Sequence, residues 1–185
     1  MSFPGIPSLD AAVMAFIQTH FHNTVTDTVF PIITSLGEAG IGWIVLSFVL
    51  LCFKKTRRTG GLVLIAMTVT LLFGELTLKN IICRLRPCNV FTDFPMLIAR
   101  PTSYSFPSGH TSSSFAAALI LTLRHKKVGW LAYIPAVLIA FSRIFLFVHY
   151  PTDVLAGILL GTLAALLTSF CLLYTSPSPR DPKTS

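Results

Sequence analysis

Residues 142–153 read SRIFLFVHYPTD and join two strongly apolar segments of the chain. Pro151 is predicted to take the first position of the second segment's helix, where its missing N–H has no cost. Asp153 then lies in the first turn of that helix, within reach of His149. A carboxylate on one imidazole nitrogen fixes the tautomer and makes the other nitrogen a better base or nucleophile. The alternative is a short interfacial loop whose polar side chains only face water, and the rest of the chain decides between the two.

The composition places the chain in a membrane. Of 185 residues, 53% are hydrophobic and 11% are charged, and the mean hydropathy is +0.74, whereas soluble domains have about 25% charged residues. The apolar runs are too long for the strands of a membrane barrel. We therefore predict an all-α integral membrane helical bundle, with residues 1–174 as a single domain.

The apolar runs predict about six transmembrane helices, with an N-terminal interfacial helix over 9–22. Whether 9–22 is interfacial or the start of one bent first span over 9–36 stays open. Glycines at 37 and 40 predict a turn before the second span. The spans are expected at 9–36, 41–53, 60–82, 107–123, 128–148 and 151–174. The polar, proline-containing tail 175–185 is predicted to be disordered, and whether it is native or added sequence is left open.

The net charge of +7 is concentrated in two basic clusters, at 54–58 and 124–127. Both clusters fall on one side of the bundle by parity, and the positive-inside rule makes that side cytoplasmic. Loop 83–106 and the junction at 149–151 then share the extracytoplasmic face. Topology and contacts with anionic lipids explain the positive charge of these clusters. We therefore expect the lipid bilayer as the partner, and neither a nucleic acid nor an obligate protein partner.

Several cations break the charge rule on the outer face, and anion binding would explain them. Lys79 and Arg86 are seven residues apart and are expected on one face of a helix that Pro87 stops. Arg143 is expected in the last turn of the preceding helix, six residues before His149. The alternative for Lys79 and Arg86 is that they extend their charged ends to the membrane interface.

The sequence FPSGH at 106–110 predicts the start of another helix, with Pro107 as its first residue. Ser108, Gly109 and His110 would then present unpaired backbone N–H groups at the positive end of a helix, which suits a phosphate or an oxyanion. An ordinary helix start is the alternative. Glu75 is expected to pair with Lys79, and Glu38 is a weaker candidate for the lining of the site.

The chain has four cysteines and shows no metal-ligand spacing among its His, Cys and acidic residues. Cys83 and Cys88 flank the start of the long loop and could form a disulfide, but free thiols are favoured. We predict no metal and no cofactor.

Three sequence blocks occur in order along the chain. They are Lys79 with Arg86-Pro87 after six intervening residues; Pro107-Ser108-Gly109-His110; and Ser142-Arg143 with His149 and Asp153 at spacings of five and three residues. Together they resemble the signature of the type 2 phosphatidic acid phosphatase superfamily, and every signature position matches. The resemblance covers 79–153 directly.

The resemblance implies a role for each matched residue and a reaction without metal. His149 is implied as a nucleophile that forms a phosphohistidine, Asp153 as its partner, and His110 as the acid for the leaving group. The phosphoryl oxygens are implied to bind Lys79, Arg86, Ser108, Gly109 and Arg143. Outside the signature, we expect Tyr150, Arg84 and Arg100 to contact the rest of the headgroup.

The chemistry indicates a multi-pass lipid phosphatase of the cell membrane. Its small size resembles the bacterial members, with phosphatidylglycerophosphate as the leading substrate and undecaprenyl pyrophosphate as an alternative. A lipid-phosphate transporter and a silent lipid-binding protein are the competing classes. Transport needs cations but has no use for an oriented nucleophile and an acid, so the set of His149, Asp153 and His110 favours the enzyme.

Overall fold

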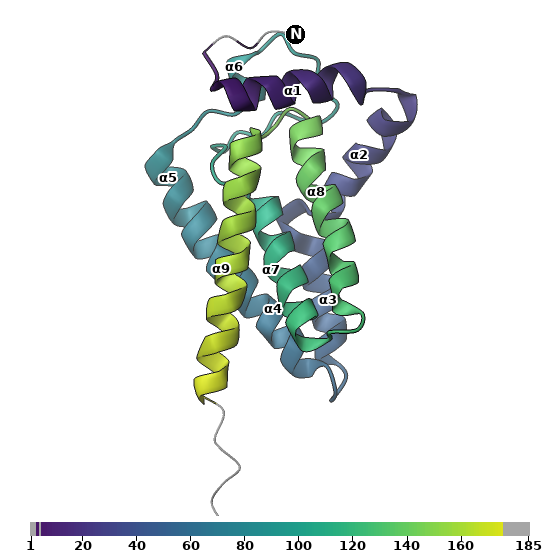
Figure 1. The fold of residues 1–185 in the computed structure, drawn as a ribbon, viewed down its shortest axis with the longest axis vertical. Coiled ribbons are helices and arrows are strands. Elements are labelled where there is room, and N and C mark those ends of the chain that lie inside the picture. The colour runs from purple at the N-terminus through teal and green to yellow at the C-terminus, as the bar shows by residue number, and fades with distance from the viewer. Residues whose placement is uncertain (1–2, 4, 176–185) are drawn as a thin grey trace, which may run out of the picture.

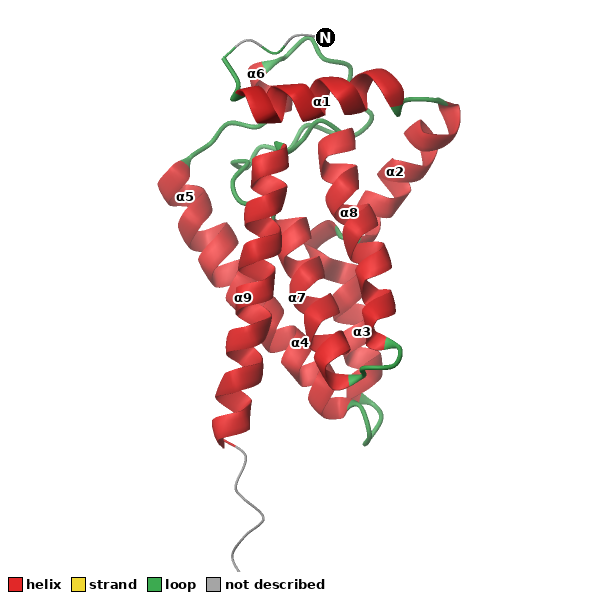
Figure 2. Cartoon of the chain, viewed as in Figure 1, coloured by secondary structure: helices red, strands yellow, loops and turns green. Residues whose placement is uncertain are grey.

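A computed structural model describes residues 3 and 5–175, and over these residues the chain consists of helices and loops without a strand (Figure 2). The predicted all-α class is confirmed. The elements are α1 (Ser8–His20), α2 (Thr24–Leu36), η1 (Glu38–Gly40), α3 (Ile41–Leu51), α4 (Arg57–Thr70), η2 (Leu71–Leu78), α5 (Lys79–Ile82), α6 (Pro87–Val90), α7 (Gly109–Arg124), η3 (Gly129–Ala132), α8 (Tyr133–Phe145) and α9 (Pro151–Thr175). The tail predicted at 175–185 lies outside the described residues, apart from Thr175.

Helix α7 is the centre of the bundle and packs against α4, α8 and α9. Its small residues allow close approach: Ala116, Ala117 and Ala118 are fully buried. On α9, a Cβ at Gly161 would lie 2.3 Å from the carbonyl oxygen of Ser112. Small residues on α7 and α9 therefore let the two helices pack closely.

Two stretches are long and apolar enough to cross a membrane, Arg57–Val90 and Pro151–Cys171. Helices α2 and α3 would add a third as a pair bent by 48°. Large hydrophobic side chains face outward along these helices, as lipid contact requires. Examples are Phe48, Phe73, Leu159 and Phe170, each more than half exposed. The chain is a multi-pass membrane protein, but the predicted count of six spans is not confirmed.

The turn predicted at Gly37 and Gly40 is instead the bend between α2 and α3, which continue in the same general direction (Figure 1). Gly40 has a φ of 70°, and a Cβ there would lie 2.4 Å from Met67 Cε. The left-handed backbone at the bend thus favours glycine. The expected first and second spans are not antiparallel neighbours, and Glu38, which follows α2 at the bend, is exposed.

Helix α1 is separate from α2 and lies across one end of the bundle, beside the connections from α5 to α7 and from α8 to α9 (Figure 1). The connections from α3 to α4 and from α7 to α8 lie at the opposite end (Figure 1). These are the positions of the two basic clusters, at 54–58 and 124–127. The predicted separation of the basic clusters from the outer loops is confirmed, and the alternative of one bent span over 9–36 is wrong.

Candidate active site

A cavity of about 910 Å³ opens among α2, η1, α4, η2, α7 and the long loop. Six of the eight predicted site residues line it: Lys79, Arg86, Gly109, His110, Arg143 and His149. The other two, Ser108 and Asp153, are fully buried behind this wall. Segments far apart in the sequence therefore converge on one polar cavity.

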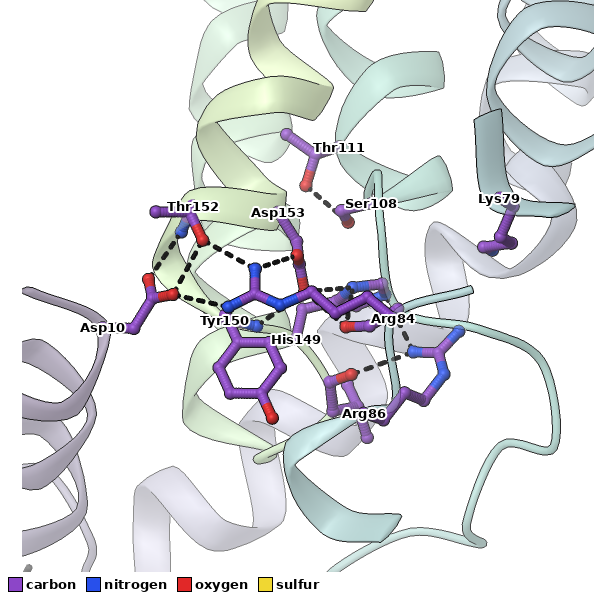
Figure 3. Close-up of polar contacts among 12 residues, drawn as sticks. Asp10, Lys79, Arg84, Arg86, Ser108, Thr111, His149, Tyr150, Thr152 and Asp153 are labelled. Carbon is purple, nitrogen blue, oxygen red and sulfur yellow. Dashed lines mark hydrogen bonds and ion pairs between the residues drawn. The ribbon is translucent and has the colours of Figure 1, made fainter. Parts of the chain in front are cut away.

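His149 lies in the short loop between α8 and α9, where its backbone N–H donates to the carbonyl of Arg143 at 3.1 Å. Its side chain is 1% exposed. The Nδ1 atom lies 3.5 Å from Asp153 Oδ2 and 3.4 Å from Ser105 Oγ, while Nε2 lies 2.9 Å from Arg86 Nη1 (Figure 3). Because Arg86 can only donate, Nε2 is the acceptor nitrogen and Nδ1 holds the proton. The nitrogen beside the cavity cations thus holds the lone pair of the ring, which here accepts from Arg86.

Asp153 is held on every side. Its Oδ2 accepts from the backbone N–H of Tyr150 at 2.9 Å and from the hydroxyl of Ser105. Its Oδ1 accepts from Arg84 Nη1 at 2.6 Å. Pro151 begins α9 and Asp153 lies in its first turn, as predicted. A carboxylate fixed this tightly also fixes the orientation of the imidazole of His149.

Arg84 does not serve the role expected of it. Its guanidinium bonds Asp10 Oδ2 at 2.7 Å and Thr152 Oγ1 at 2.7 Å, and lies 3.8 Å from the ring centroid of Tyr150 (Figure 3). Neither Arg84 nor Tyr150 lines the cavity. Arg84 and Tyr150 thus contact the support of Asp153 and not the cavity, whereas Arg100 does line the cavity.

Lys79 and Arg86 reach the cavity by a different route from the one expected. The helix ends at Ile82, because Cys83 adopts a φ of 50°, and Pro87 begins the short helix α6. The prediction of one helical face that Pro87 terminates is wrong. The chain leaves the helix at the left-handed Cys83 and passes through a short loop to Arg86, whose own backbone is extended and whose side chain lines the cavity.

Arg86 and Arg143 are each 4% exposed and are held by neutral oxygens. Arg86 donates to the carbonyl of Ser103 at 2.7 Å and to that of Val148 at 3.0 Å. Arg143 donates through Nη1 to the hydroxyl of Thr34. Its Nε has no partner among the described residues. Neither guanidinium is in hydrogen-bond contact with a carboxylate among the described residues, so both can bind an anion in the cavity.

Lys79 pairs with Glu75 at 2.6 Å, as predicted. Glu75 lies against the start of α7, where a Cβ at Gly109 would meet Glu75 Oε1 at 2.1 Å. A larger residue at this position would displace the carboxylate of Glu75. Glu38 also lines the cavity, so its weaker candidacy is confirmed.

The start of α7 differs from the prediction by two residues. The helix begins at Gly109, with Ser108 as its N-cap, so Pro107 is not the first helical residue. The backbone N–H of Ser108 donates to the carbonyl of Asp153 at 3.1 Å, and its hydroxyl accepts from Thr111 at 2.9 Å. Ser108 therefore does not reach the cavity, while Gly109 and His110 do.

Comparisons with known proteins agree with this geometry. The pattern described as "PAP2 superfamily" matches residues 59–176. The chain belongs to the PAP2 superfamily. It is 39% identical over 127 residues to the undecaprenyl-diphosphatase of Sulfolobus acidocaldarius, covering 68% of this chain and 61% of that relative. It is 31% identical over 155 residues to undecaprenyl-diphosphatase BcrC of Bacillus subtilis, covering 79% and 75%.

Solved PAP2 structures share the fold. The phosphatidylglycerolphosphate phosphatase of Bacillus subtilis matches with a TM-score of 0.74 and 29% identity, covering 94% of this chain and 89% of that one. Aquifex aeolicus LpxE matches with a TM-score of 0.77 at 24% identity, which shows the fold alone. The fold match thus extends beyond the PAP2 region to almost the whole chain.

The electrostatics of this PAP2 site favour a neutral histidine. Burial first, and then the positive charges of Arg86, Arg143 and Lys79, lower the pKa of His149 well below its usual value. A lowered histidine pKa keeps the ring deprotonated, and therefore nucleophilic, as the pH falls toward 6. Among the described residues, no group of three His, Cys, Asp or Glu side chains is placed to hold a metal ion.

Sequence reasoning missed four residues that support the site. Thr34, Ser103 and Ser105 hold Arg143, Arg86 and the His149–Asp153 pair. Asp10 holds Arg84 from α1. Single hydroxyl residues give no local signal, but a lone carboxylate in the apolar run of 9–22 is a signal that could have found Asp10. Cys83 and Cys88 are free thiols, as favoured.

Proposed function

We propose that this chain is an integral-membrane lipid phosphatase that transfers a phosphoryl group to His149 and then to water. The observation on which the proposal depends is the orientation of His149. Its Nδ1 faces Asp153, and its Nε2 faces a cavity lined by cations. Phosphoryl transfer needs such positioning together with positive charge around the equatorial oxygens.

The proposed reaction has two steps. The substrate phosphate binds Lys79, Arg86 and Arg143, and its oxygens displace the bond between Arg86 and His149. Nε2 then attacks phosphorus, an N–P bond forms, and the P–O bond to the leaving group breaks. His110 gives that leaving oxygen a proton. In the second step water attacks phosphorus, His110 takes up its proton, and inorganic phosphate leaves His149.

The start of α7 would complete the phosphate site. The backbone N–H groups of Gly109 and His110 fall in the first turn, where helix N–H groups have no acceptor within the helix. Gly109 lines the cavity beside Lys79. Ser108 would not bind phosphate itself. Its backbone N–H donates to the carbonyl of Asp153 and so fixes the start of α7 beside α9.

A lipid-phosphate transporter is the competing function. A transporter needs the cations of the cavity and an exit path, but it gains nothing from an imidazole held by Asp153 and Ser105. The buried hydrogen bonds to Asp153 therefore favour the enzyme over the transporter.

For the substrate, we place an undecaprenyl-type diphosphate first and phosphatidylglycerophosphate second. This reverses the order that the sequence suggested, because the relatives at 39% and 31% identity are named undecaprenyl-diphosphatases. Phosphatidylglycerophosphate stays a candidate because a phosphatase named for it is 29% identical over nearly the whole chain. A cavity of about 910 Å³ has room for either headgroup.

The test is phosphate release by the purified protein from a panel of these lipids in the presence of EDTA. We expect release from at least one lipid phosphate, with a rate that chelation leaves unchanged, since Lys79, Arg86 and Arg143 supply the positive charge. Loss of activity in EDTA that magnesium or zinc restores would contradict the metal-independent reaction. Transport of the lipid without phosphate release would favour the competing function.

We further propose that residues 1–174 act as one domain in the cell membrane and that the cavity opens on the extracytoplasmic face. The basic clusters at 54–58 and 124–127 support this orientation through the positive-inside rule. Helix α1 would lie along the outer interface, where it covers the loops at the end of the bundle (Figure 1).

Cysteine labelling in intact cells tests the orientation. A Thr92→Cys variant, on the long loop, is expected to react with a membrane-impermeant maleimide before permeabilisation. A Lys126→Cys variant, in the second basic cluster, is the matched control and should react only afterwards. Both should be made in a background without the exposed native cysteines Cys52, Cys83 and Cys171. The reverse labelling pattern would overturn the proposed topology.

A further inference from the structure

Asp10 on α1 is a fully buried carboxylate that lies outside the PAP2 match at 59–176. Its Oδ2 accepts from Arg84 Nη2 at 2.7 Å and from Thr152 Oγ1 at 2.8 Å. Its Oδ1 accepts from the backbone N–H of Thr152 at 2.9 Å. Thr152 is the second residue of α9, so Asp10 satisfies an N–H at the start of the helix that contains Asp153.

Arg84 connects the two buried carboxylates. One nitrogen of its guanidinium bonds Asp10, and the other bonds Asp153 Oδ1 at 2.6 Å (Figure 3). The guanidinium lies 3.8 Å from the centroid of the Tyr150 ring, which fixes its plane. Since Asp153 Oδ2 faces His149, one line of contacts runs from α1 to the reactive imidazole.

A second contact of α1 reaches the other helix beside His149. Gln18 follows Asp10 by eight residues, so the two side chains share a face of α1. Gln18 is 6% exposed, and its Nε2 donates to the carbonyls of Phe145 at 3.0 Å and Ile144 at 3.3 Å. These carbonyls end α8. Helix α1 therefore bonds both helix ends that flank the loop of His149.

We infer that Asp10 is a positioning residue for the phosphoryl transfer, acting through Arg84 and Thr152 to hold Asp153 against His149. The inference rests on the proposed function of His149. Asp10 does not line the cavity, and its partners are not the cations that would bind phosphate. Its loss should therefore slow the chemical step and leave phosphate binding intact.

The physical reason is the balance of charge on Arg84. With Asp10 present, the guanidinium has a carboxylate on each side and Asp153 is not drawn out of place. Without it, a partly buried positive charge interacts with Asp153 alone, and the N–H of Thr152 loses its acceptor. Both changes turn the carboxylate of Asp153 away from Nδ1, which frees the imidazole to adopt other tautomers and orientations.

The test begins with Asp10→Asn in the full chain, purified in detergent. We expect kcat to fall by about 10- to 100-fold, as when other residues that orient a reacting group are mutated. The inhibition constant of inorganic phosphate should stay within about threefold of the wild-type value. Asp27→Asn is the matched control, because Asp27 on α2 pairs with His22 instead and its loss should change kcat by less than about twofold.

A mutant cycle with Arg84 separates positioning from general damage to the fold. If the two residues act through one line of contacts, Asp10→Asn combined with Arg84→Gln should lose no more than about threefold beyond the worse single variant. If the losses in kcat of the two single variants multiply in the double variant, the inference is overturned. It is also overturned if the inhibition constant of phosphate rises by the same factor as kcat falls. Should Asp10→Asn alone not fold, the charge-balanced double variant decides: a kcat within about twofold of wild type overturns the inference, and a loss of tenfold or more supports it.

These outcomes are distinct from a failure of the proposed function. If the wild-type protein releases no phosphate from any lipid of the panel, the proposed reaction is wrong whatever the Asp10 variants do. If the wild type is active and Asp10→Asn keeps its kcat, the reaction stands and only the role of Asp10 fails.

Discussion

His149→Ala is expected to form no phosphoenzyme with any substrate and to lose at least roughly 10³-fold in kcat, as other enzymes do when the nucleophile is removed. His149 points its Nε2 at the cavity, and the other nitrogen of its ring, Nδ1, faces the carboxylate of Asp153. His110 also lines the cavity, but among the described residues no carboxylate forms a hydrogen bond or ion pair with it. The measurement is rapid-quench trapping of an acid-labile, base-stable phosphohistidine with ³²P-labelled lipid.

The matched control for this variant is His125→Ala. His125 follows α7 at the opposite end of the bundle and bonds Thr59 at 3.1 Å, so its loss should leave the labelled intermediate intact. Label that still appears on the protein in His149→Ala would show that another group is the nucleophile. Equal loss of label in both variants would show that the effect is on folding.

His110→Ala is expected to fail selectively, according to the leaving group. A lipid monophosphate releases an alkoxide, which needs a proton as it departs, so turnover should fall by about 10²- to 10⁴-fold. A diphosphate releases a phosphate, which is already a weak base, so its turnover should fall much less. The comparison is best made with farnesyl monophosphate and farnesyl diphosphate, which differ only in that group.

His110→Gln is the companion variant, because glutamine preserves polarity and much of the volume but cannot supply the proton. It should show the same selectivity as alanine. If either variant loses equal activity on the two substrates, His110 is not the acid and its contribution is to binding. Full activity of His110→Gln on the monophosphate would also contradict the assignment.

The sequence alone predicted the parts of the site that depend on local geometry. Asp153 follows His149 by four residues across a proline that begins a helix, so their contact is set by spacing along the chain. The pairing of Glu75 with Lys79 follows from the same rule within one helix. The separation of the basic clusters from the outer loops followed from composition, because an apolar run that enters the membrane must leave it on the other side.

Contacts between distant segments were decided only by the tertiary structure. Nothing near Gly37 and Gly40 distinguishes a turn from a 48° bend, because packing against α4 selects the bend. The helix ends at the left-handed Cys83, and the side chain of Arg86 is then held by carbonyls of other segments, those of Ser103 and Val148.

Asp10 shows the same limit most clearly. It lies 142 residues before Thr152 in the chain, and its contacts form only when α1 crosses the end of the bundle. In the sequence Asp10 is one polar residue in an apolar helix; in the fold it is a buried charge that must be paired because water cannot reach it. The sequence therefore determined which residues can do the chemistry, and long-range packing decided which other residues hold them in place.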